Sequence, residues 1–223
     1  MLRDAHPAIL ETVRQAHSIH ILGAGLNEDR PAHRAVHDLD GRGWRLVPIH
    51  PRDAGGAILG RPIRSELEQG RSLDIVVLFL APERAKSAVV SLIAQYPPES
   101  IPLIWFQPGS EHEEVLEMLN DAGIMHIVDD CIVRFVLRHH LSAANPTGVE
   151  PWYLQVQSGG DDGCSVWTVE EGKTTQQAPQ TPLEWCGDLM DLACSEHVVP
   201  RYIRTLVGDG ETLVEAAKRL AHS

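Results

Sequence analysis

Short apolar runs alternate with amphipathic segments along the first two-thirds of the chain. The apolar runs predict strands over residues 19–22, 44–49, 74–80, 102–106 and 124–128. Apolar side chains at helical spacing predict helices over residues 7–17, 31–40, 82–96 and 111–122. The run at 74–80 is apolar at nearly every position, which is typical of a parallel strand covered on both faces. Strands that alternate with helices in this way predict an α/β fold with a doubly wound, five-stranded parallel sheet of the Rossmann-like type.

The loop after the first strand carries the pattern of a phosphate-binding turn. Strand 19–22 runs into Gly23–Ala24–Gly25, and the next helix is expected to begin at Pro31. Glycines let the backbone turn tightly and approach a phosphate, and a helix N-terminus favours an anion. A side chain at Gly23 is therefore predicted to block a ligand while the protein stays folded. In parallel sheets the loops after the strands meet at one edge, where we expect the ligand to bind.

An NAD site does not fit this turn. Glu28 stands at the third position of the glycine fingerprint for dinucleotides, where a glycine is required. His50 and Pro51 stand at the end of the second strand, where an acid would bind the ribose. The unit is therefore predicted to bind a nucleotide other than NAD.

Composition restricts the classes of partner. The chain has 223 residues and a formal net charge of −12, which disfavours nucleic acid as a partner. No apolar run approaches the ~20 residues that span a bilayer, and the first residues lack a signal-peptide pattern. The four cysteines lack Cys-x-x-Cys spacing, which favours free thiols in a reducing compartment. We therefore expect a cytoplasmic protein that binds neither nucleic acid nor membrane.

Positive charge is concentrated near the predicted turn. Residues 30–64 hold seven arginines against three acids. Most of these arginines are expected to be solvated surface residues. Two or three of them at one crevice would suffice to bind a polyphosphate.

Several short motifs follow one another in a specific order. They are Gly23-Ala24-Gly25, Asn27 with Arg30-Pro31, Val47-Pro48-Ile49-His50-Pro51, Leu59-Gly60 with Ser65-x-Leu67, Trp105-Phe106-Gln107-Pro108-Gly109, and Ala122-Gly123 with Asp129-Asp130-Cys131. In this order they resemble the motifs of the stand-alone bacterial CoA-binding domain family, over residues of about 5–141. These domains are related to the CoA-binding domain of the succinyl-CoA synthetase alpha subunit. The resemblance implies a Rossmann-like fold whose crevice binds CoA or an acyl-CoA, without a known reaction.

The resemblance also implies which residues touch the ligand. The diphosphate is expected over Gly23–Asn27 and the following helix N-terminus, with Arg30 and Arg34 as charge partners. The adenine is expected near His50 and Pro51. The predicted binding set is Gly23, Ala24, Gly25, Asn27, Arg30, Arg34, His50, Pro51 and Gln107. Cationic residues of the family are missing at Leu80, Ala81 and Asp130, so fewer fixed charges face the ligand.

Other candidates for chemistry carry weaker signals. His33 and His37 have the spacing of a metal-binding pair, but no third ligand lies nearby in sequence, so two solvated helix histidines are expected. Cys131 follows two aspartates, which disfavour a reactive thiolate. His139 and His140 are expected at a helix end. The sequence shows no triad order, nucleophile elbow or Gly-Lys-Ser/Thr phosphate loop, so we predict no catalytic residues and no metal site.

Residues after the segment 143–148 form a different pattern. Strands are predicted at 152–157 and 164–170 around a Gly-Asp loop. Thr181–Glu184 reads as a capping box that opens a helix to Ser195, and further helices are predicted at 200–207 and 211–221. The chain is thus predicted to divide into a nucleotide-binding domain at 1–143 and a small α+β unit at 149–223. Three of the five tryptophans lie in the second part, as a small core or as a docking face for a partner or for the first domain. A protein partner or self-association through the C-terminal unit is also considered.

Function is therefore predicted as non-catalytic binding of CoA or an acyl-CoA. One alternative is an NADP-type dinucleotide, with Arg52 near the 2′-phosphate. A second is a ligand-free regulatory or scaffold protein that acts through the C-terminal unit, whose last helices resemble a helix-turn-helix. A third is an enzyme that acts on acyl-CoA.

Overall fold

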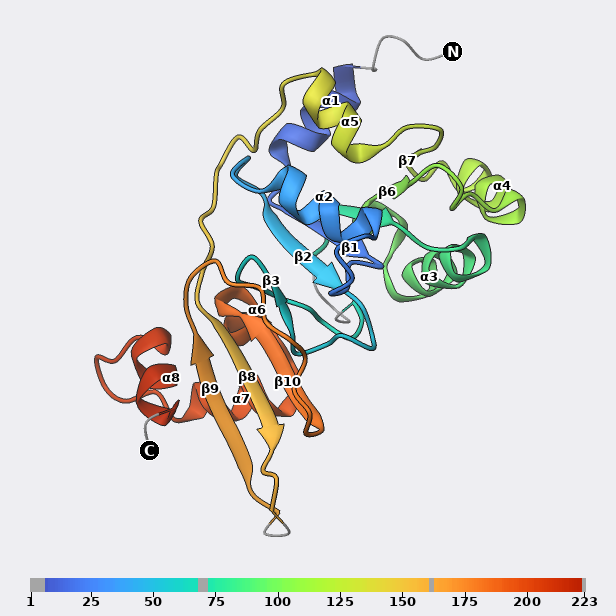
Figure 1. Cartoon of the computed structure of the whole chain (residues 1–223). Coiled ribbons are helices and arrows are strands. Elements are labelled where there is room, and N and C mark those ends of the chain that lie inside the picture. The colour runs from blue at the N-terminus through green and yellow to red at the C-terminus, as the bar shows by residue number, and fades with distance from the viewer. Residues whose placement is uncertain (1–6, 68–71, 161–162, 222–223) are drawn as a thin grey trace. The chain divides into compact units, whose positions relative to one another are not determined.

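A computed structural model describes residues 7–67, 72–160 and 163–221 of the protein. The described residues fall into two compact units (Figure 1). The first is drawn from Met1–Val47 and Gln69–Gly148, and the second from Pro48–Glu68 and Val149–Ser223. Each unit contains a sheet of its own.

A five-stranded sheet in the order β2-β1-β5-β6-β7 organises the first unit. Its strands are β1 (Ser18–Leu22), β2 (Arg45–Ile49), β5 (Ile75–Leu78), β6 (Leu103–Phe106) and β7 (His126–Ile127). The helices are α1 (Pro7–Gln15), α2 (Pro31–Leu39), α3 (Pro82–Gln95), α4 (Glu113–Asp121) and α5 (Ile132–Arg138), with a 3₁₀ turn at Pro98–Ser100. The pairs β1–β5, β5–β6 and β6–β7 are parallel. The predicted doubly wound parallel sheet is confirmed. Helix α5 is an additional helix, since the sequence analysis placed only a helix end at His139 and no helix before it.

The strand order explains why this sheet forms and where a ligand can bind. Every residue of β5 and β6 is buried, as the apolar runs predict. Asp74 fixes the start of β1, because its carboxylate accepts from Ser18 N at 2.9 Å and from His17 N at 3.0 Å. The chain passes from β1 to β2 on one side and later returns to β5 on the other side of β1. The strand order therefore reverses between β1 and β5, and the loops at their carboxyl ends are where a sheet of this type is expected to bind a ligand.

A three-stranded antiparallel sheet in the order β10-β8-β9 organises the second unit. It consists of β8 (Trp152–Gln157), β9 (Ser165–Glu170) and β10 (Leu183–Asp188). Three helices follow it in the chain, α6 (Leu189–Cys194), α7 (Val198–Thr205) and α8 (Leu213–Ala221). A hairpin of β3 (Ala57–Ile58) and β4 (Arg61–Pro62) comes from the earlier segment. The predicted small α+β unit is thus confirmed.

Aromatic side chains fill the space between this sheet and its helices. Tyr153, Trp167 and Trp185 stack in series, with ring centroids 5.7 and 6.1 Å apart. Trp167 Nε1 donates to the carbonyl of Ala217 in α8 at 3.0 Å. Burial raises the pKa of Tyr153 to about 12. The sequence left two roles open for the tryptophans of this unit, a small core or a docking face. In the structure these side chains form a small core.

Residues 48–67 cover the opposite face of the same sheet. Cys186 follows Trp185 in β10, so its side chain points to the opposite face of the sheet. Its thiol donates to Ile63 O at 3.2 Å. Ala57 exchanges two backbone hydrogen bonds with Gln176, and both Ile58 and Ile63 are completely buried. Residues 48–67 carry some of the motifs from which the sequence analysis predicts the nucleotide-binding domain, yet they pack in the second unit. The predicted division into 1–143 and 149–223 stays a prediction, and its test has to include residues 48–67.

The predicted helix from Thr181 to Ser195 is wrong in its first half. Residues 183–188 form strand β10, paired with β8, and the helix begins only at Leu189. Glu184 caps no helix, because its carboxylate accepts from Gln155 at 2.6 Å and Ser165 at 2.9 Å across the sheet. The capping box lies later, where Asp188 and Asp191 bond each other's backbone N–H. Pairing with β8 therefore overrides the local capping signal.

Candidate nucleotide-binding site

The loops after β1 and β5 touch at the point where the strand order reverses. Gly23 directly follows β1 and has a φ of +97°, a conformation that favours glycine. A Cβ atom built on Gly23 would lie 2.4 Å from the carbonyl oxygen of Phe79. Phe79 N donates to Leu22 O at 3.0 Å, which holds the two loops together. Glycine is therefore strongly favoured at this contact with a neighbouring loop, and we expect a side chain at Gly23 to strain the fold as well as the proposed site.

A buried histidine supports the glycine turn from the side of α2. His33 is 2% exposed, and its Nδ1 lies 2.8 Å from the carbonyl oxygen of Gly25. A carbonyl only accepts, so His33 Nδ1 carries the hydrogen. His33 Nε2 lies 3.2 Å from His37 Nε2. The expectation of two solvated histidines is wrong for His33, because the turn needs a donor at this place.

No metal site joins these histidines among the residues that the structure describes. His33 and His37 stack with ring centroids 5.0 Å apart. Among the described residues no cluster of three or more His, Cys, Asp or Glu side chains could hold a metal ion. His33 contacts the turn directly, and His37 contacts His33.

The N-terminus of α2 follows the turn and has the features of an anion site. Pro31 occupies the first turn, Arg30 is the N-cap with extended backbone, and the first turn contains no acid. A helix start leaves backbone N–H groups without intrahelical partners and carries partial positive charge. Arg30 and Arg34 are both exposed here. Two exposed arginines and the donors of the helix start thus follow the turn, together with the exposed acids Glu28 and Asp29.

Local hydrogen bonds shape the segment between the turn and α2. Asn27 Oδ1 accepts from Asp29 N at 3.0 Å, and Arg34 Nη2 donates to Asp29 O at 2.8 Å. Ala24 is completely buried. Asn27 and Arg34 therefore already hold the loop shape, and Arg30 is the cation closest in sequence to the helix start.

Gln107 follows β6 at the same carboxyl edge. It is 6% exposed, and its Nε2 has no hydrogen-bond partner within the described part of the chain. Its main chain is fixed, because Gln107 O accepts from Ser110 N at 2.8 Å and from Ser110 Oγ at 2.7 Å. A buried donor without an acceptor costs about 1–3 kcal/mol. An acceptor atom of a bound ligand would relieve that cost.

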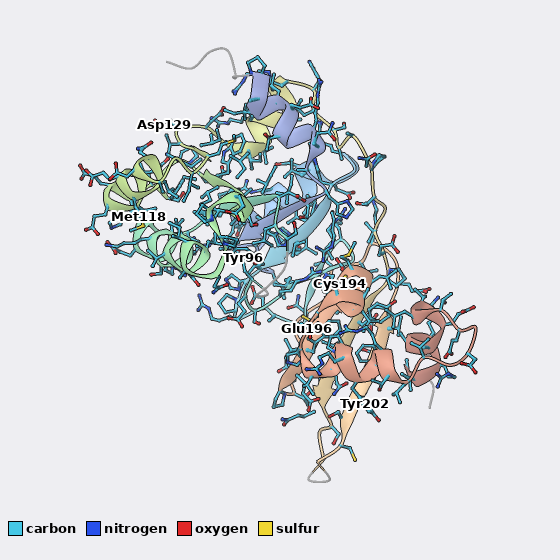
Figure 2. The ribbon with its side chains drawn as sticks, turned by 180° about the vertical axis from the view of Figure 1, so that it is seen from behind. Tyr96, Met118, Asp129, Cys194, Glu196 and Tyr202 are labelled. Carbon is cyan, nitrogen blue, oxygen red and sulfur yellow. The ribbon has the colours of Figure 1, made fainter. Side chains whose placement is uncertain are left out.

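Two of the three positions that lack the family's cations offer no charge at all. Leu80 is half-buried, and Ala81 is the exposed N-cap of α3. At the third, Asp130 pairs with Arg138 of α5 at 2.6 Å, so its negative charge is compensated. Asp129, labelled in Figure 2, precedes this pair with φ of +59°. Cys131 is the N-cap of α5 and is half-buried.

His50 and Pro51 belong to the second unit. His50 Nδ1 lies 3.0 Å from Asp53 Oδ2, and Pro51 is exposed. Nearby in the same unit, Arg64 is 9% exposed and pairs with Asp188 and Asp191. Arg64 was grouped with arginines of which most were expected to be solvated. Nothing in the local sequence indicates its burial, because both acids lie more than 120 residues away.

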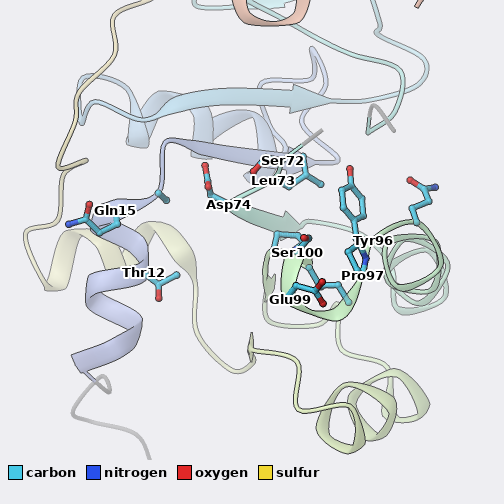
Figure 3. Close-up of a pocket in the computed structure, with 13 residues that line it drawn as sticks. Thr12, Gln15, Ser72, Leu73, Asp74, Tyr96, Pro97, Glu99 and Ser100 are labelled. Carbon is cyan, nitrogen blue, oxygen red and sulfur yellow. The ribbon is translucent and has the colours of Figure 1, made fainter. Parts of the chain in front are cut away.

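A cavity of about 680 Å³ lies at the other edge of the sheet, where the strands begin (Figure 3). Its lining comes from the end of α1, the residues before β5, and the connection between α3 and β6, among them Thr12, Asp74 and Tyr96. The carboxylate of Asp74 already accepts hydrogen bonds from Ser18 at the start of β1. The sequence did not predict this cavity, and it contains none of the predicted binding residues.

The second unit exposes apolar side chains on α6 and α7. Val198 and Tyr202 are 71% and 61% exposed and lie one turn apart, and Met190 is 41% exposed. Figure 2 shows Tyr202 with Cys194 and Glu196 on this helical side of the unit. A protein partner or self-association through the C-terminal unit stays a prediction. Among the described residues, no helix is long and apolar enough to span a membrane.

The first unit is therefore a Rossmann-like α/β domain. It presents a glycine turn, an open helix N-terminus and a buried amide at the edge where domains of this class bind nucleotides. The chain belongs to the CoA binding domain family, whose profile matches residues 17–135.

Relatives of known sequence or structure match the same part of the chain. The uncharacterized protein YneT of Bacillus subtilis (strain 168) is 25% identical over 132 residues, which are 59% of this chain and 94% of that protein. The structure of cell-free ID.343 from Thermus thermophilus is 29% identical with a TM-score of 0.52, and the match covers 59% of this chain and 96% of that one. A hypothetical protein from Pyrococcus horikoshii OT3 shares the fold at 23% identity, with a TM-score of 0.52 over 59% of this chain and 89% of that one. Residues 149–223 lie outside the family match.

Proposed function

We propose that this protein binds CoA or an acyl-CoA at the carboxyl edge of the parallel sheet and catalyses no reaction on it. Membership of the CoA binding domain family over residues 17–135 carries this proposal. The strand-order reversal between β1 and β5 supports the same edge, because open α/β sheets bind ligands there.

The diphosphate is assigned to the turn Gly23–Asn27 and to the N-terminus of α2. Backbone N–H groups and the helix dipole favour an anion at such a place. Arg30 supplies the charged contact, since Arg34 already donates to the loop backbone. Gln107 donates its unpaired amide hydrogen to a ligand acceptor. These groups recognise a ligand and transfer no proton, which is why the proposed role is binding alone.

The first test compares ligands by thermal shift and calorimetry on the full chain. CoA and acetyl-CoA are expected to raise the melting temperature, and CoA at ~100 times its Kd adds about 2.7 kcal/mol of stability. NAD is expected to give no shift. Arg30→Ala is expected to raise the Kd for CoA by about tenfold or more, since a hydrogen bond to a charged group contributes about 1.5–3 kcal/mol.

Arg14→Ala is the matched control, because Arg14 is an exposed arginine of the first unit in the last turn of α1. It is expected to leave the affinity for CoA unchanged. Absence of any shift with millimolar CoA, together with a shift for NADP, would refute CoA binding and favour a dinucleotide.

Gln107→Met separates ligand binding from protein stability. Methionine has a similar length and no donor, so the ligand-free protein is expected to keep or slightly increase its stability when the unpaired amide is removed. The Kd for CoA is expected to rise by about tenfold, as for one lost hydrogen bond of about 1.4 kcal/mol. Thermal unfolding without ligand and calorimetry with CoA measure the two effects. A less stable variant with unchanged affinity would show that the amide serves the fold instead.

A further inference from the structure

The cavity at the starting edge of the parallel sheet is separate from the proposed nucleotide site. It has a volume of about 680 Å³, and all of its lining residues belong to the first unit. Sites for small molecules commonly have about 300–1,000 Å³, so this cavity has the size to hold one. The nucleotide site is proposed at the opposite edge, where the strands end. A ligand of the cavity therefore needs its own explanation.

We propose that this cavity binds a small organic cation, an ammonium or guanidinium group on an apolar body, with the carboxylate of Asp74 as its ion partner. The proposal does not depend on CoA binding, because the two sites use different residues at opposite edges of the sheet.

The charge of the lining decides the charge of the ligand. Asp74 and Glu99 contribute carboxylates, and the lining residues that the structure describes include no lysine, arginine or histidine. Figure 3 shows Asp74 between α1 on one side and Glu99 of the connection between α3 and β6 on the other. Both carboxylates repel an anion and attract a cation. A phosphate or carboxylate ligand is therefore disfavoured here.

One oxygen of Asp74 remains available to a ligand. Oδ2 accepts from Ser18 N at 2.9 Å, from His17 N at 3.0 Å and from Ser18 Oγ at 3.1 Å. These are the hydrogen bonds of this carboxylate within the described part of the chain, so Oδ1 keeps its capacity to accept. The three bonds also hold the carboxylate in place before a ligand arrives, which favours binding. Asp74 is half-buried, so salt screens its charge less than at an open surface.

Polar side chains of α1 add further acceptors. Thr12 Oγ1 donates its hydrogen to Ala8 O at 2.9 Å, which leaves the lone pairs of the hydroxyl oxygen. Gln15 Nε2 donates to Glu11 Oε1 at 2.8 Å, which leaves the carbonyl oxygen of Gln15. An ammonium carries three donors and a guanidinium five, and neither accepts. The cation thus complements a lining in which acceptors are in excess.

Buried apolar side chains complete the lining and exclude a bare metal ion as the best ligand. Ala16, Leu73 and Tyr96 are 5%, 6% and 9% exposed. Contact with an apolar body would remove both surfaces from water. Among the described residues no cluster of three or more His, Cys, Asp or Glu side chains could hold a metal ion. An amphipathic organic cation therefore fits the cavity better than an inorganic one.

The experiment is an NMR titration of the full chain with three probes of similar shape. At neutral pH phenethylamine is a cation, phenethyl alcohol is neutral and hydrocinnamate is an anion. Phenethylamine is expected to shift the backbone amide signals of Ser18 and Ser100 with a Kd of about 1 mM, as for a ligand of its size. The alcohol and the anion are expected to bind at least about fivefold more weakly, since neither makes a charged hydrogen bond to Asp74.

Asp74→Asn tests the carboxylate while it keeps the start of β1. Asparagine retains a carbonyl oxygen for Ser18 and His17, and its amide puts a donor in place of Oδ1 and removes the charge. The Kd for phenethylamine is expected to rise by about fivefold or more, with unchanged circular dichroism. Asp121→Asn is the matched control, because Asp121 is an exposed acid of α4 outside the cavity. It is expected to leave the Kd unchanged.

Glu99→Gln is a second variant at an exposed position, where the fold is not at risk. It is expected to raise the Kd by about twofold, as for a solvated ion pair. Equal affinity for the three probes overturns the proposal, and so does an equal Kd in the wild-type protein and Asp74→Asn. Absence of shifts with about 10 mM phenethylamine also overturns it. If Asp74→Asn does not fold, an unchanged Kd in Glu99→Gln overturns it. Each of these outcomes leaves the proposed CoA site untouched, since that site has its own titration.

Discussion

Replacing Gly23 with alanine is expected to destabilise the first unit by several kcal/mol. The new Cβ would lie 2.4 Å from Phe79 O, a distance that real Cβ atoms do not show, and the atom in the way is backbone. The φ of +97° adds a second cost, of about 1–3 kcal/mol for a residue other than glycine. Relief of the clash requires the loops after β1 and β5 to separate, which costs about 1–3 kcal/mol more by analogy with overpacked cores. Chemical denaturation of the variant measures the sum.

Gly41→Ala is the control that separates the two costs. Gly41 has φ of +75°, but a Cβ there meets nothing within 4 Å. Its alanine variant is expected to lose only the conformational part, about 1 kcal/mol or somewhat more. Equal losses for the two variants would show that the loops after β1 and β5 are not in close contact. Loss of CoA binding in a Gly23 variant is therefore no measure of a ligand contact, unless the variant is first shown to be folded.

The sequence was sufficient for the parallel sheet because each element there is specified locally. The run at 75–80 is apolar throughout, and Pro31 and Pro82 mark helix starts at both predicted places. His33 was missed although a signal was present. It precedes Val36 by three residues, so it lies on the buried face of α2, where a polar side chain needs a partner.

The C-terminal unit was harder to predict because its decisive contacts are distant in sequence. Residues 181–184 carry a helix-start pattern, and only the partner strand β8 makes 183–188 a strand. Local propensity is a weak prior that such pairing overrides. Arg64 resembles the exposed arginines around it, and its acids lie in β10 and α6. The packing of residues 48–67 was missed for two reasons. Their partners are distant in sequence, and the family motifs assign this segment to the first domain.

A fragment of residues 1–148 is expected to keep its parallel sheet and to lose the ordered packing of residues 48–67. The strands β1, β5, β6 and β7 and the helices between them all lie before the cut. The fragment lacks Gln176, Cys186 and the two aspartates that hold this segment. Trypsin is therefore expected to cleave after Arg64 at least about tenfold faster in the fragment than in the full chain, where Arg64 is buried. Tenfold corresponds to about 1.4 kcal/mol in the free energy of local opening.

Cleavage after Arg84 in α3 is the internal control, because Arg84 is exposed and belongs to the first unit. An unchanged rate at Arg84 with a faster rate at Arg64 supports an independent sheet domain with a segment that the C-terminal unit orders. Faster cleavage at both sites would refute the predicted boundary, since the sheet itself would then depend on residues 149–223. Equal resistance at Arg64 would show that the segment packs without them. Ile58 and Ile63, completely buried in the full chain, become apolar surface in the fragment, so it is also expected to associate at lower concentration than the full chain.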